Sequence, residues 1–430
     1  MEKCSQTYKA YVKILERELV PAMGCTEPTA VAFCAARARA ALGSSPASIL
    51  VRASGNVIKN VKSATVPHTG GRRGMETAAA AGVLYGDEEA GLEVLSGADE
   101  QQVGALSAFM ENTTIQILPA ESDAALDIEV TVKDGENTAT VRIADEHTNI
   151  VLVEKNGEIL FRKDLSCESD RGRKDPDEPD YSLLTIEEIV DFADTCDLAD
   201  VREVLERQIA MNYAICEEGM RHPYGANIGK VLLNAYGDNI RLRAKAMAAA
   251  GSDARMNGCE MPVVINSGSG NQGITASVPV LEYAKELGSE EDTILRALLI
   301  SNLVTLHQKH GIGRLSAYCG AVSAGAGAGA GITYLHGGGF REIAHTVVNA
   351  LAITSGIVCD GAKSSCAAKI AAAVDAGILG FEMFRQGQQF YGGDGLVAKG
   401  VENTIRNISR LGRVGMKGTD REIIQIMTED

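Results

Sequence analysis

The sequence contains no tryptophan, and aromatic residues make up only 4% of its 430 residues. It also lacks an excess of basic charge, because 41 Lys and Arg stand against 57 Asp and Glu and give a formal net charge of −16. A surface that binds phosphate groups requires clustered Lys and Arg. The charge balance therefore argues against nucleic acid and against an anionic membrane as partners.

Long hydrophobic runs are also missing. No stretch approaches the roughly 18 apolar residues of a membrane span, and the first residues, MEKCSQTYKAYVK, contain no run of signal-peptide length. We therefore expect a cytoplasmic protein without a membrane partner. In that compartment, the ten cysteines are expected to be thiols, metal ligands or catalytic groups rather than a disulfide framework.

Helical periodicity dominates both ends of the chain. Residues 5–42 are predicted as helix with a break at Gly24-Cys25, and Pro28 suits the first turn of the restarted helix. A capping box begins at Thr185, and most of the chain beyond it has helical periodicity interrupted by glycine clusters. The stretch AVSAGAGAGAGITYL at 321–335 predicts a helix whose small residues let neighbouring helices approach closely.

The middle of the chain has the two-residue period of strands. Apolar and polar residues alternate from Ile49 to Val66 and again from Asp127 to Arg162, with helices expected around 75–116. Asp134-Gly135 and Asn156-Gly157 are typical of tight hairpins between strands. This region is predicted to be a sheet with helices packed on it.

These patterns predict an α+β fold. Residues 1–44 and 181–430 would form a mainly helical domain, into which an α+β sheet-containing unit is inserted at 45–165. Residues 166–180 are dense in charge and proline with little to bury, so they are predicted to be an exposed linker.

Three cysteines are predicted at helix ends, with the spacing C-x39-C-x6-C. Cys319 and Cys366 each stand at the start of a helix, and Cys359 is expected at the end of an apolar helix over 341–358. Unpaired N–H groups at a helix start favour a thiolate, and thiolates hold iron–sulfur clusters. However, this spacing is less specific than a compact cysteine run, and buried cysteines also serve as small hydrophobic residues. The spacing alone leaves both interpretations open.

Four motifs add a resemblance to a known family: GCTEP at 24–28, NSGSGNQG at 266–273, the CG pair at 319, and CDGAKSSCAAK at 359–369. Together and in this order they resemble the L-cysteine desulfidase family, which is related to the α chain of iron–sulfur L-serine dehydratases. The resemblance runs over almost the whole chain.

The resemblance implies a cofactor and a reaction. Cys319, Cys359 and Cys366 would bind a [4Fe–4S] cluster with one iron free of a protein thiolate, and Cys25 would be the catalytic base. Such enzymes convert L-cysteine and water to pyruvate, ammonia and hydrogen sulfide without pyridoxal phosphate. The dehydratase relatives eliminate water from L-serine.

This chemistry suits the residues. An open iron site is a Lewis acid, and sulfide is a soft leaving group that iron can accept. Cys25 lies just ahead of a helix start, where we expect a thiolate able to take the α-proton, and Gly24 would give the backbone the freedom to turn there. The alternative is that Cys25 is a buried structural thiol.

Further polar residues are candidates for binding an amino-acid substrate. The segment before the helix ITASVPVLEYAKEL offers hydroxyls, amides and backbone donors suited to a carboxylate, although capping of the helix would explain it as well. Polar residues of the inserted unit would close over the substrate, and a lysine between two cluster cysteines would balance charge or meet the carboxylate. For His147 the alternative is a purely structural role, and for Lys363 it is a solvated position in the loop. The candidates are Ser267, Ser269, Asn271, Gln272, Asn56, Asn60, His147, Asn149 and Lys363.

The end of the sequence bears on the choice of substrate. Some dehydratase relatives use a C-terminal cysteine as a removable fourth ligand, whereas this sequence ends IIQIMTED. This difference favours the desulfidase. L-serine dehydratase, a non-catalytic iron–sulfur redox or iron sensor, and a pyridoxal phosphate lyase remain as alternatives, and a homo-oligomer is left open.

Overall fold

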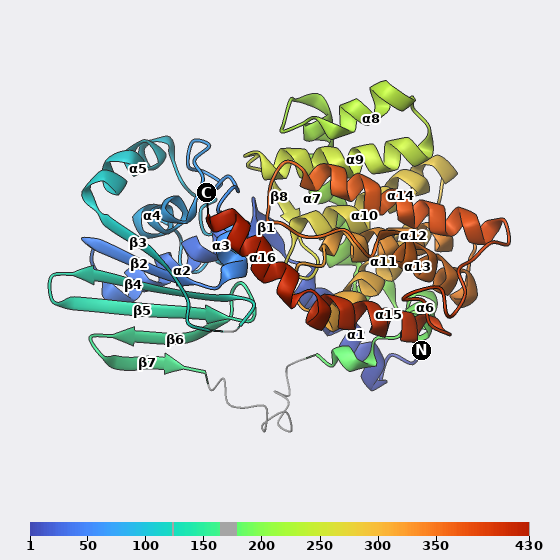
Figure 1. Ribbon diagram of the computed structural model, residues 1–430, viewed down its shortest axis with the longest axis horizontal. Coiled ribbons are helices and arrows are strands. Elements are labelled where there is room, and N and C mark those ends of the chain that lie inside the picture. The colour runs from blue at the N-terminus through green and yellow to red at the C-terminus, as the bar shows by residue number, and fades with distance from the viewer. Residues whose placement is uncertain (123, 164–178, 430) are drawn as a thin grey trace.

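The computed structural model describes residues 1–122, 124–163 and 179–429. These residues form an α+β fold, as predicted, in which a sheet with its own helices adjoins a larger body of helices (Figure 1). The predicted linker 166–180 lies outside the described residues, except for residues 179 and 180. None of the described helices is long and apolar enough to cross a membrane.

Among the described residues, a six-stranded mixed sheet has the strand order β3-β2-β4-β5-β6-β7. Only β2 and β3 are parallel, and the register sets Val51 opposite Val130, which in turn lies opposite Val141. Asn156 and Gly157 have φ of 51° and 82° and close the β6–β7 hairpin, as predicted. The strands are β2 (Ser48–Ala53), β3 (Thr114–Pro119), β4 (Asp127–Asp134), β5 (Asn137–Ala144), β6 (Ile150–Lys155) and β7 (Glu158–Arg162).

One face of the sheet is covered by helix α2 (Thr26–Leu42), which also packs on α4 (Met75–Tyr85). Val51, Val130 and Val141 point to this covered face and are fully buried. Gly82 lets α4 approach α2 so closely that a Cβ there would overlap the backbone of Ala32. Helix α5 (Glu100–Asn112) packs on α4 and β3. The division into residues 1–44 plus 181–430 and an inserted 45–165 stays a prediction.

The strand predicted over 49–66 is wrong in its second half. Strand β2 ends at Ala53, and α3 (Gly55–Val61) follows. Val57 and Val61, four residues apart, are both buried, so the helical period describes this stretch better than alternation does. A short run rich in valine and isoleucine is compatible with the helical period and with the two-residue period of a strand. The sequence alone therefore did not distinguish the two.

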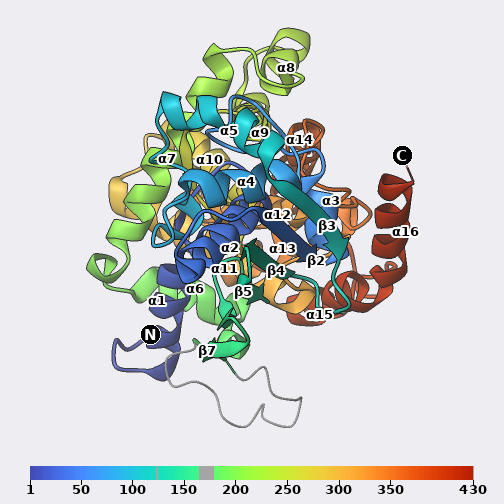
Figure 2. The ribbon, with the colours of Figure 1, turned by 90° about the vertical axis from the view of Figure 1, so that its left-hand side faces the viewer.

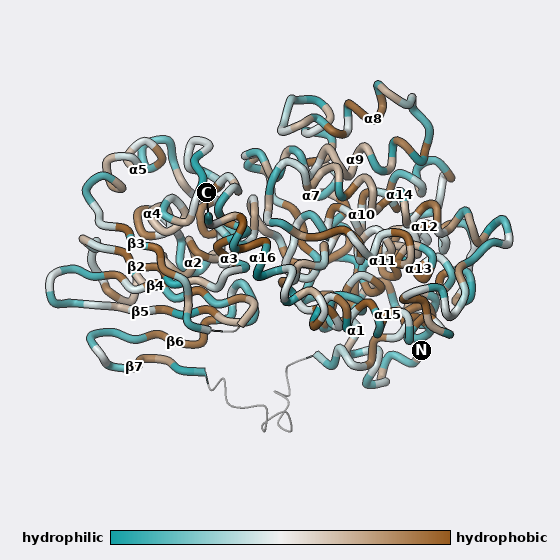
Figure 3. The backbone as a smooth tube through the Cα atoms, in the orientation of Figure 1, coloured by the Kyte–Doolittle hydropathy of each residue, from teal (hydrophilic) through white to brown (hydrophobic). Residues whose placement is uncertain are grey.

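The helical body consists of α1 and the helices that follow the sheet, and the small-residue helix α12 lies at its centre, in contact with α10, α11, α13 and α14. Gly325 and Gly329 bring α12 against the backbone of α14, as the sequence predicted. Hydrophobic segments lie inside both parts of the molecule (Figure 3). The helices are α1 (Gln6–Glu18), α6 (Ile186–Thr195), α7 (Arg202–Arg221), α8 (Ile228–Tyr236), α9 (Ile240–Met256), α10 (Gly270–Leu287), α11 (Glu291–Ile312), α12 (Gly320–Leu335), α13 (Phe340–Thr354), α14 (Cys366–Arg385), α15 (Val401–Arg410) and α16 (Lys417–Thr428).

The apolar helix predicted over 341–358 is too long at its C-terminal end. Helix α13 ends at Thr354, and Ser355-Gly356 turns the chain away. Val358 then forms a β-bridge with Tyr318. Cys359 therefore lies on an extended segment rather than at the end of a helix.

Contacts between segments far apart in the sequence join the parts of the molecule. The break after α1 is longer than predicted, because β1 (Pro21–Met23) pairs there with β8 (Pro262–Val264). Gly24 follows with φ of 59°, which fits the predicted turn before Cys25. Another contact is made by α16, which lies beside α3 in both views (Figures 1 and 2).

Candidate active site

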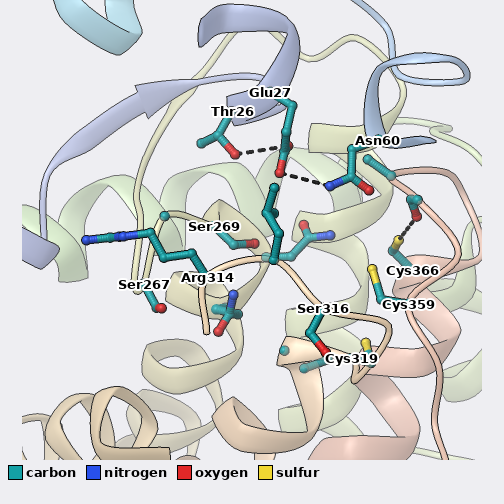
Figure 4. Close-up of a pocket in the computed structure, with 18 of the residues that line it drawn as sticks. Thr26, Glu27, Asn60, Ser267, Ser269, Arg314, Ser316, Cys319, Cys359 and Cys366 are labelled. Carbon is teal, nitrogen blue, oxygen red and sulfur yellow. Dashed lines mark hydrogen bonds between the residues drawn. The ribbon is translucent and has the colours of Figure 1, made fainter. Parts of the chain in front are cut away.

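A cavity of about 100 Å³ lies where α2 and α3 meet the helical body (Figure 4). Side chains from both parts of the molecule line it, so it is assembled from segments far apart in the sequence. Ten of the residues predicted from the sequence are among them. These are Cys25, Asn56, Asn60, Ser267, Ser269, Asn271, Gln272, Cys319, Cys359 and Cys366.

Backbone hydrogen bonds hold two of the three predicted cluster ligands side by side. The N–H of Cys319 donates to the carbonyl of Ile357 at 3.2 Å, and the N–H of Cys359 donates to the carbonyl of Ala317 at 2.7 Å. Cys319 is also the N-cap residue of α12. The segment before α12 and the segment after α13 therefore fix the spacing of these two thiols.

Cys366 begins α14 and completes the set (Figure 4). Its thiol lies 3.6 Å from the carbonyl oxygen of Gly361. Gly361 has φ of 95°, and a Cβ there would lie 2.6 Å from the carbonyl oxygen of Lys59. Glycine is thus required at this turn by conformation and by space. Lys369 ties the same loop down by donating to the carbonyl of Val358 at 2.8 Å.

Burial works against deprotonation of two of the three thiols, Cys319 and Cys366. Burial, and after it the neighbouring Cys359, raise the pKa of Cys319 to about 12. Burial also raises the pKa of Cys366. The three cysteines can be thiolates together only if positive charge lies between them. Among the described residues, no group of three His, Cys, Asp or Glu side chains is placed to hold a single metal ion.

Unpartnered polar atoms on the cavity wall also fit a bound group. The side-chain oxygens of Asn60, Gln272 and Tyr318 are buried and accept or donate no hydrogen bond within the described protein. Buried polar groups are nearly always paired, so such atoms at a cavity indicate a ligand or ordered water. The donor set and these atoms together fit an iron–sulfur group and a small polar substrate.

Cys25 lies in the same cavity, at the N-cap position of α2. Its thiol donates a hydrogen bond to Oε2 of Glu27 at 3.1 Å. Burial raises the pKa of Cys25 well above its usual value, the carboxylate of Glu27 adds to this, and Arg255 acts in the opposite direction. The thiolate expected from the helix start alone is therefore wrong for the protein without a bound group, because desolvation and Glu27 outweigh the helix dipole.

Glu27 is the buried acid at the centre of this network. Besides Cys25, it accepts hydrogen bonds from Asn60 at 3.0 Å and Thr26 at 3.2 Å (Figure 4). His147 is buried behind it, with Nε2 3.6 Å from Oε1 of Glu27. Burial alone would raise the pKa of Glu27, but His147 and Cys25 outweigh burial and lower it to about 2.

The 267–273 segment forms a turn in the cavity wall. Ser267 and Gly268 have φ of 49° and 76°, and α10 begins at Gly270, earlier than predicted. Asn271 and Gln272 therefore lie in its first turn rather than before it. Arg255 donates to Asn271 at 3.1 Å.

Gln272 packs on the start of α12. A Cβ at Gly320 would lie 2.5 Å from the amide carbon of Gln272. The CG pair at 319 thus has a physical reason, because only glycine after Cys319 leaves room for this amide.

Three predicted residues do not line the cavity. His147 lies behind two residues of the cavity wall: its Nε2 is 3.6 Å from Glu27, and a Cβ added at Gly268 would lie 2.8 Å from its ring. Asn149 donates to the carbonyl of Ala144 at 2.8 Å and accepts from Lys163. Lys363 forms an ion pair with Asp360.

The sequence interpretation missed several charged residues of the cavity wall. Glu27 is part of the GCTEP motif and could have been found there. Lys369 is the last residue of the CDGAKSSCAAK motif and could likewise have been found there. The others lie within helices that show no local signal, or in the 313–319 loop, and only the fold brings them to the site. These residues are Lys59, Arg255, Lys309 and Arg314.

Comparison with known proteins agrees with this geometry. Residues 89–425 match the family model of the serine dehydratase alpha chain. The chain belongs to that family. The match includes the three cysteines that line the cavity but begins after Cys25. The family consists of iron–sulfur-dependent lyases that act on a small molecule.

Similar proteins over the full chain carry the description UPF0597 protein. One from Desulfitobacterium hafniense is 56% identical and covers 99% of this chain and 98% of its own. One from Lachnoclostridium phytofermentans is 49% identical and covers 98% of this chain and 99% of its own. One from Finegoldia magna is 46% identical and covers 98% of this chain and 100% of its own. Unlike the family match, these similarities extend across the GCTEP motif at 24–28.

Proposed function

We propose that the protein is a [4Fe–4S]-dependent lyase that converts L-cysteine and water to pyruvate, ammonia and hydrogen sulfide. The observation that carries this proposal is the convergence of three cysteines, Cys25 and the 267–273 turn on one cavity. We further propose that the enzyme acts in the cytoplasm.

Cys319, Cys359 and Cys366 would hold the cluster. When bound, the cluster supplies a Lewis-acidic iron that polarises the substrate and accepts a soft leaving group. The first turn of α10 would bind the substrate carboxylate through backbone donors and the side chains of Ser269 and Asn271. Arg255 would hold Asn271 in place through their hydrogen bond.

Cys25 is the proposed acceptor of the α-proton. Its own proton has to leave first, and Oε2 of Glu27 at 3.1 Å accepts the hydrogen bond from that thiol. His147 behind Glu27 would extend the path away from the cavity. Loss of the α-proton and cleavage of the Cβ–S bond then release hydrogen sulfide and leave aminoacrylate, which water hydrolyses to pyruvate and ammonia.

The same site suits L-serine in principle, because the two substrates differ only in the leaving atom. Two arguments favour L-cysteine: the resemblance of the motifs to desulfidases, and the soft character of sulfide as a ligand of iron. L-serine dehydratase is the alternative within the family.

The experiment is an anaerobic reconstitution with iron and sulfide, followed by addition of L-cysteine or L-serine. We expect about four irons per chain, with sulfide and pyruvate formed from L-cysteine. Pyruvate from L-serine alone would assign the dehydratase. A cluster without turnover of either amino acid would contradict the lyase and favour a sensor.

Two variants test the assigned roles. Cys25→Ser should retain the cluster and lose turnover, whereas a sensor would keep its cluster response. Cys319→Ser should lose iron. Cys4→Ser, at an exposed cysteine far from the cavity, is the matched control and should change neither.

A further inference from the structure

One lysine in the cavity wall has no acidic partner among the residues that the structure describes. Of the lysines that line the cavity, Lys59 pairs with Asp420 and Lys369 pairs with Asp360. Lys309 on α11 is 3% exposed, and its ammonium donates to the carbonyl oxygen of a neighbouring loop residue at 3.3 Å. Within the described part of the chain, no carboxylate forms an ion pair with it. A buried ammonium without an anion is costly, because hydration is lost and nothing replaces it.

The position of Lys309 shows where the missing anion belongs. Burial lowers the pKa of Lys309 to about 8, and the groups that act in the opposite direction are Cys359 and Cys319. The carbonyl that Lys309 contacts belongs to Arg314, whose guanidinium is neutralised by Glu18 at 2.8 Å and by Glu146 at 3.0 Å. Lys309, Cys319 and Cys359 line the same cavity, so an anion that pairs with Lys309 would lie there, beside the two thiols.

We propose that Lys309 is the counter-cation of the iron–sulfur group held by Cys319, Cys359 and Cys366 and that it sets the reduction potential of that group. The inference rests on the proposed function only for the presence of the cluster and holds for either amino acid as substrate. An oxidised four-iron core with three thiolates is a net anion, and each added electron makes it more negative. A fixed ammonium in a low-dielectric cavity therefore favours the reduced state.

Sequence proximity had suggested a different lysine for this role. Lys363 lies between two cluster cysteines in the chain, but its ammonium pairs with Asp360 and does not line the cavity. Lys309 precedes Cys319 by ten residues and lies on another helix. The pair of lysines thus provides a matched comparison, because both are close to the cysteines in sequence and only one is in the cavity.

The test is an anaerobic redox titration of the iron-loaded protein, followed by the visible absorbance of the cluster. Lys309→Met should shift the equilibrium toward the oxidised cluster by at least tenfold, which lowers the potential by about 59 mV for a one-electron couple. Lys309→Arg keeps the charge and should stay within about threefold of the wild type, as should Lys363→Met. Lys309→Gln carries the same expectation as Lys309→Met if the methionine variant does not fold.

Two results would overturn the inference. One is an unchanged potential in both uncharged variants. The other is a raised KM for the amino acid with no change in potential, which would assign Lys309 to the substrate carboxylate. A wild-type protein that assembles no cluster would refute the proposed function itself, so the two failures are distinguishable.

Discussion

The thiol of Cys25 donates to the carboxylate of Glu27 across 3.1 Å, inside a cavity that three further cysteines line. A hydrogen-bonded thiol and acid, two residues apart at a helix start, form a compact unit for moving a proton. Because the same carboxylate also accepts from Asn60 and lies 3.6 Å from His147, its orientation is fixed from three directions.

The first prediction concerns proton transfer. Glu27→Gln removes the acceptor of the Cys25 proton and nearly preserves the side-chain shape. We expect the iron content to be unchanged and kcat to fall by about 10²- to 10⁴-fold, the usual contribution of a positioned acid or base. Steady-state kinetics on reconstituted protein measure this. Glu136→Gln, at an exposed turn between β4 and β5, is the control, and equal kinetics for the two variants would refute the role of Glu27.

The second prediction concerns acid stability. The pKa of Glu27 is lowered from 4.5 to about 2 in the folded protein, so its stabilising effect is complete above pH 4.5. The effect is lost as the pH falls from there toward 2, because the unfolded chain takes up the proton first. The difference between the two pKa values corresponds to about 3 kcal/mol.

Urea unfolding of the iron-free protein between pH 6 and pH 3 measures this effect. The free energy of unfolding of the wild type should fall more steeply with acid than that of Glu27→Gln. Identical slopes would mean that the Glu27 carboxylate does not contribute in this range.

The third prediction concerns the contact between α16 and α3. Lys59 and Asp420 form an ion pair at 2.5 Å, and the side chain of Lys59 is 1% exposed. Asp420→Asn leaves this lysine buried without its anion, so we expect a loss of about 3 kcal/mol of stability. Hydrogen exchange of α16 should also accelerate. Glu422→Gln, at an exposed position on the same helix, should leave both quantities unchanged.

The fourth prediction concerns Gly320. A Cβ there would lie 2.5 Å from the amide of Gln272, so Gly320→Ala should displace this side chain and cost about 1–3 kcal/mol of stability. We also expect a raised KM, because Gln272 lines the cavity. Gly356→Ala, where a Cβ would meet nothing within 4 Å, is the control. Equal thermal unfolding of the two variants would show that the site around Gln272 can adapt.

The sequence predicted the residues whose signals are local. The cysteines with their flanking glycines and the polar 267–273 turn are short motifs, and the structure brings them together at one cavity. Lys309 and Arg255 escaped prediction because neither lies in a motif. Their relation to the site depends on how α11 and α9 pack, which no local pattern encodes.

The errors in the fold have a similar origin. A seven-residue helix such as α3 shows too few turns for its period to be distinguished from alternation. Helix α13 stops at Thr354 because the following segment forms a bridge with Tyr318, a residue 40 positions earlier than its partner Val358. Alternation and the Asn156-Gly157 hairpin, by contrast, predicted β4 to β7 correctly, because each strand pairs with its neighbour in the chain. The β4–β5 turn lies one residue later than predicted, at Gly135-Glu136.

The pairing of β1 with β8 has a consequence for the order of events after synthesis. The strand that precedes Cys25 finds its partner about 240 residues later, and the last thiol of the cavity comes later still. Contacts so distant in sequence form slowly, because a long loop has to close before they stabilise the chain. In the proposed function, assembly of the iron–sulfur group would therefore have to wait until the chain has been made through Cys366, and a chain truncated before that residue would lack one of the three proposed ligands.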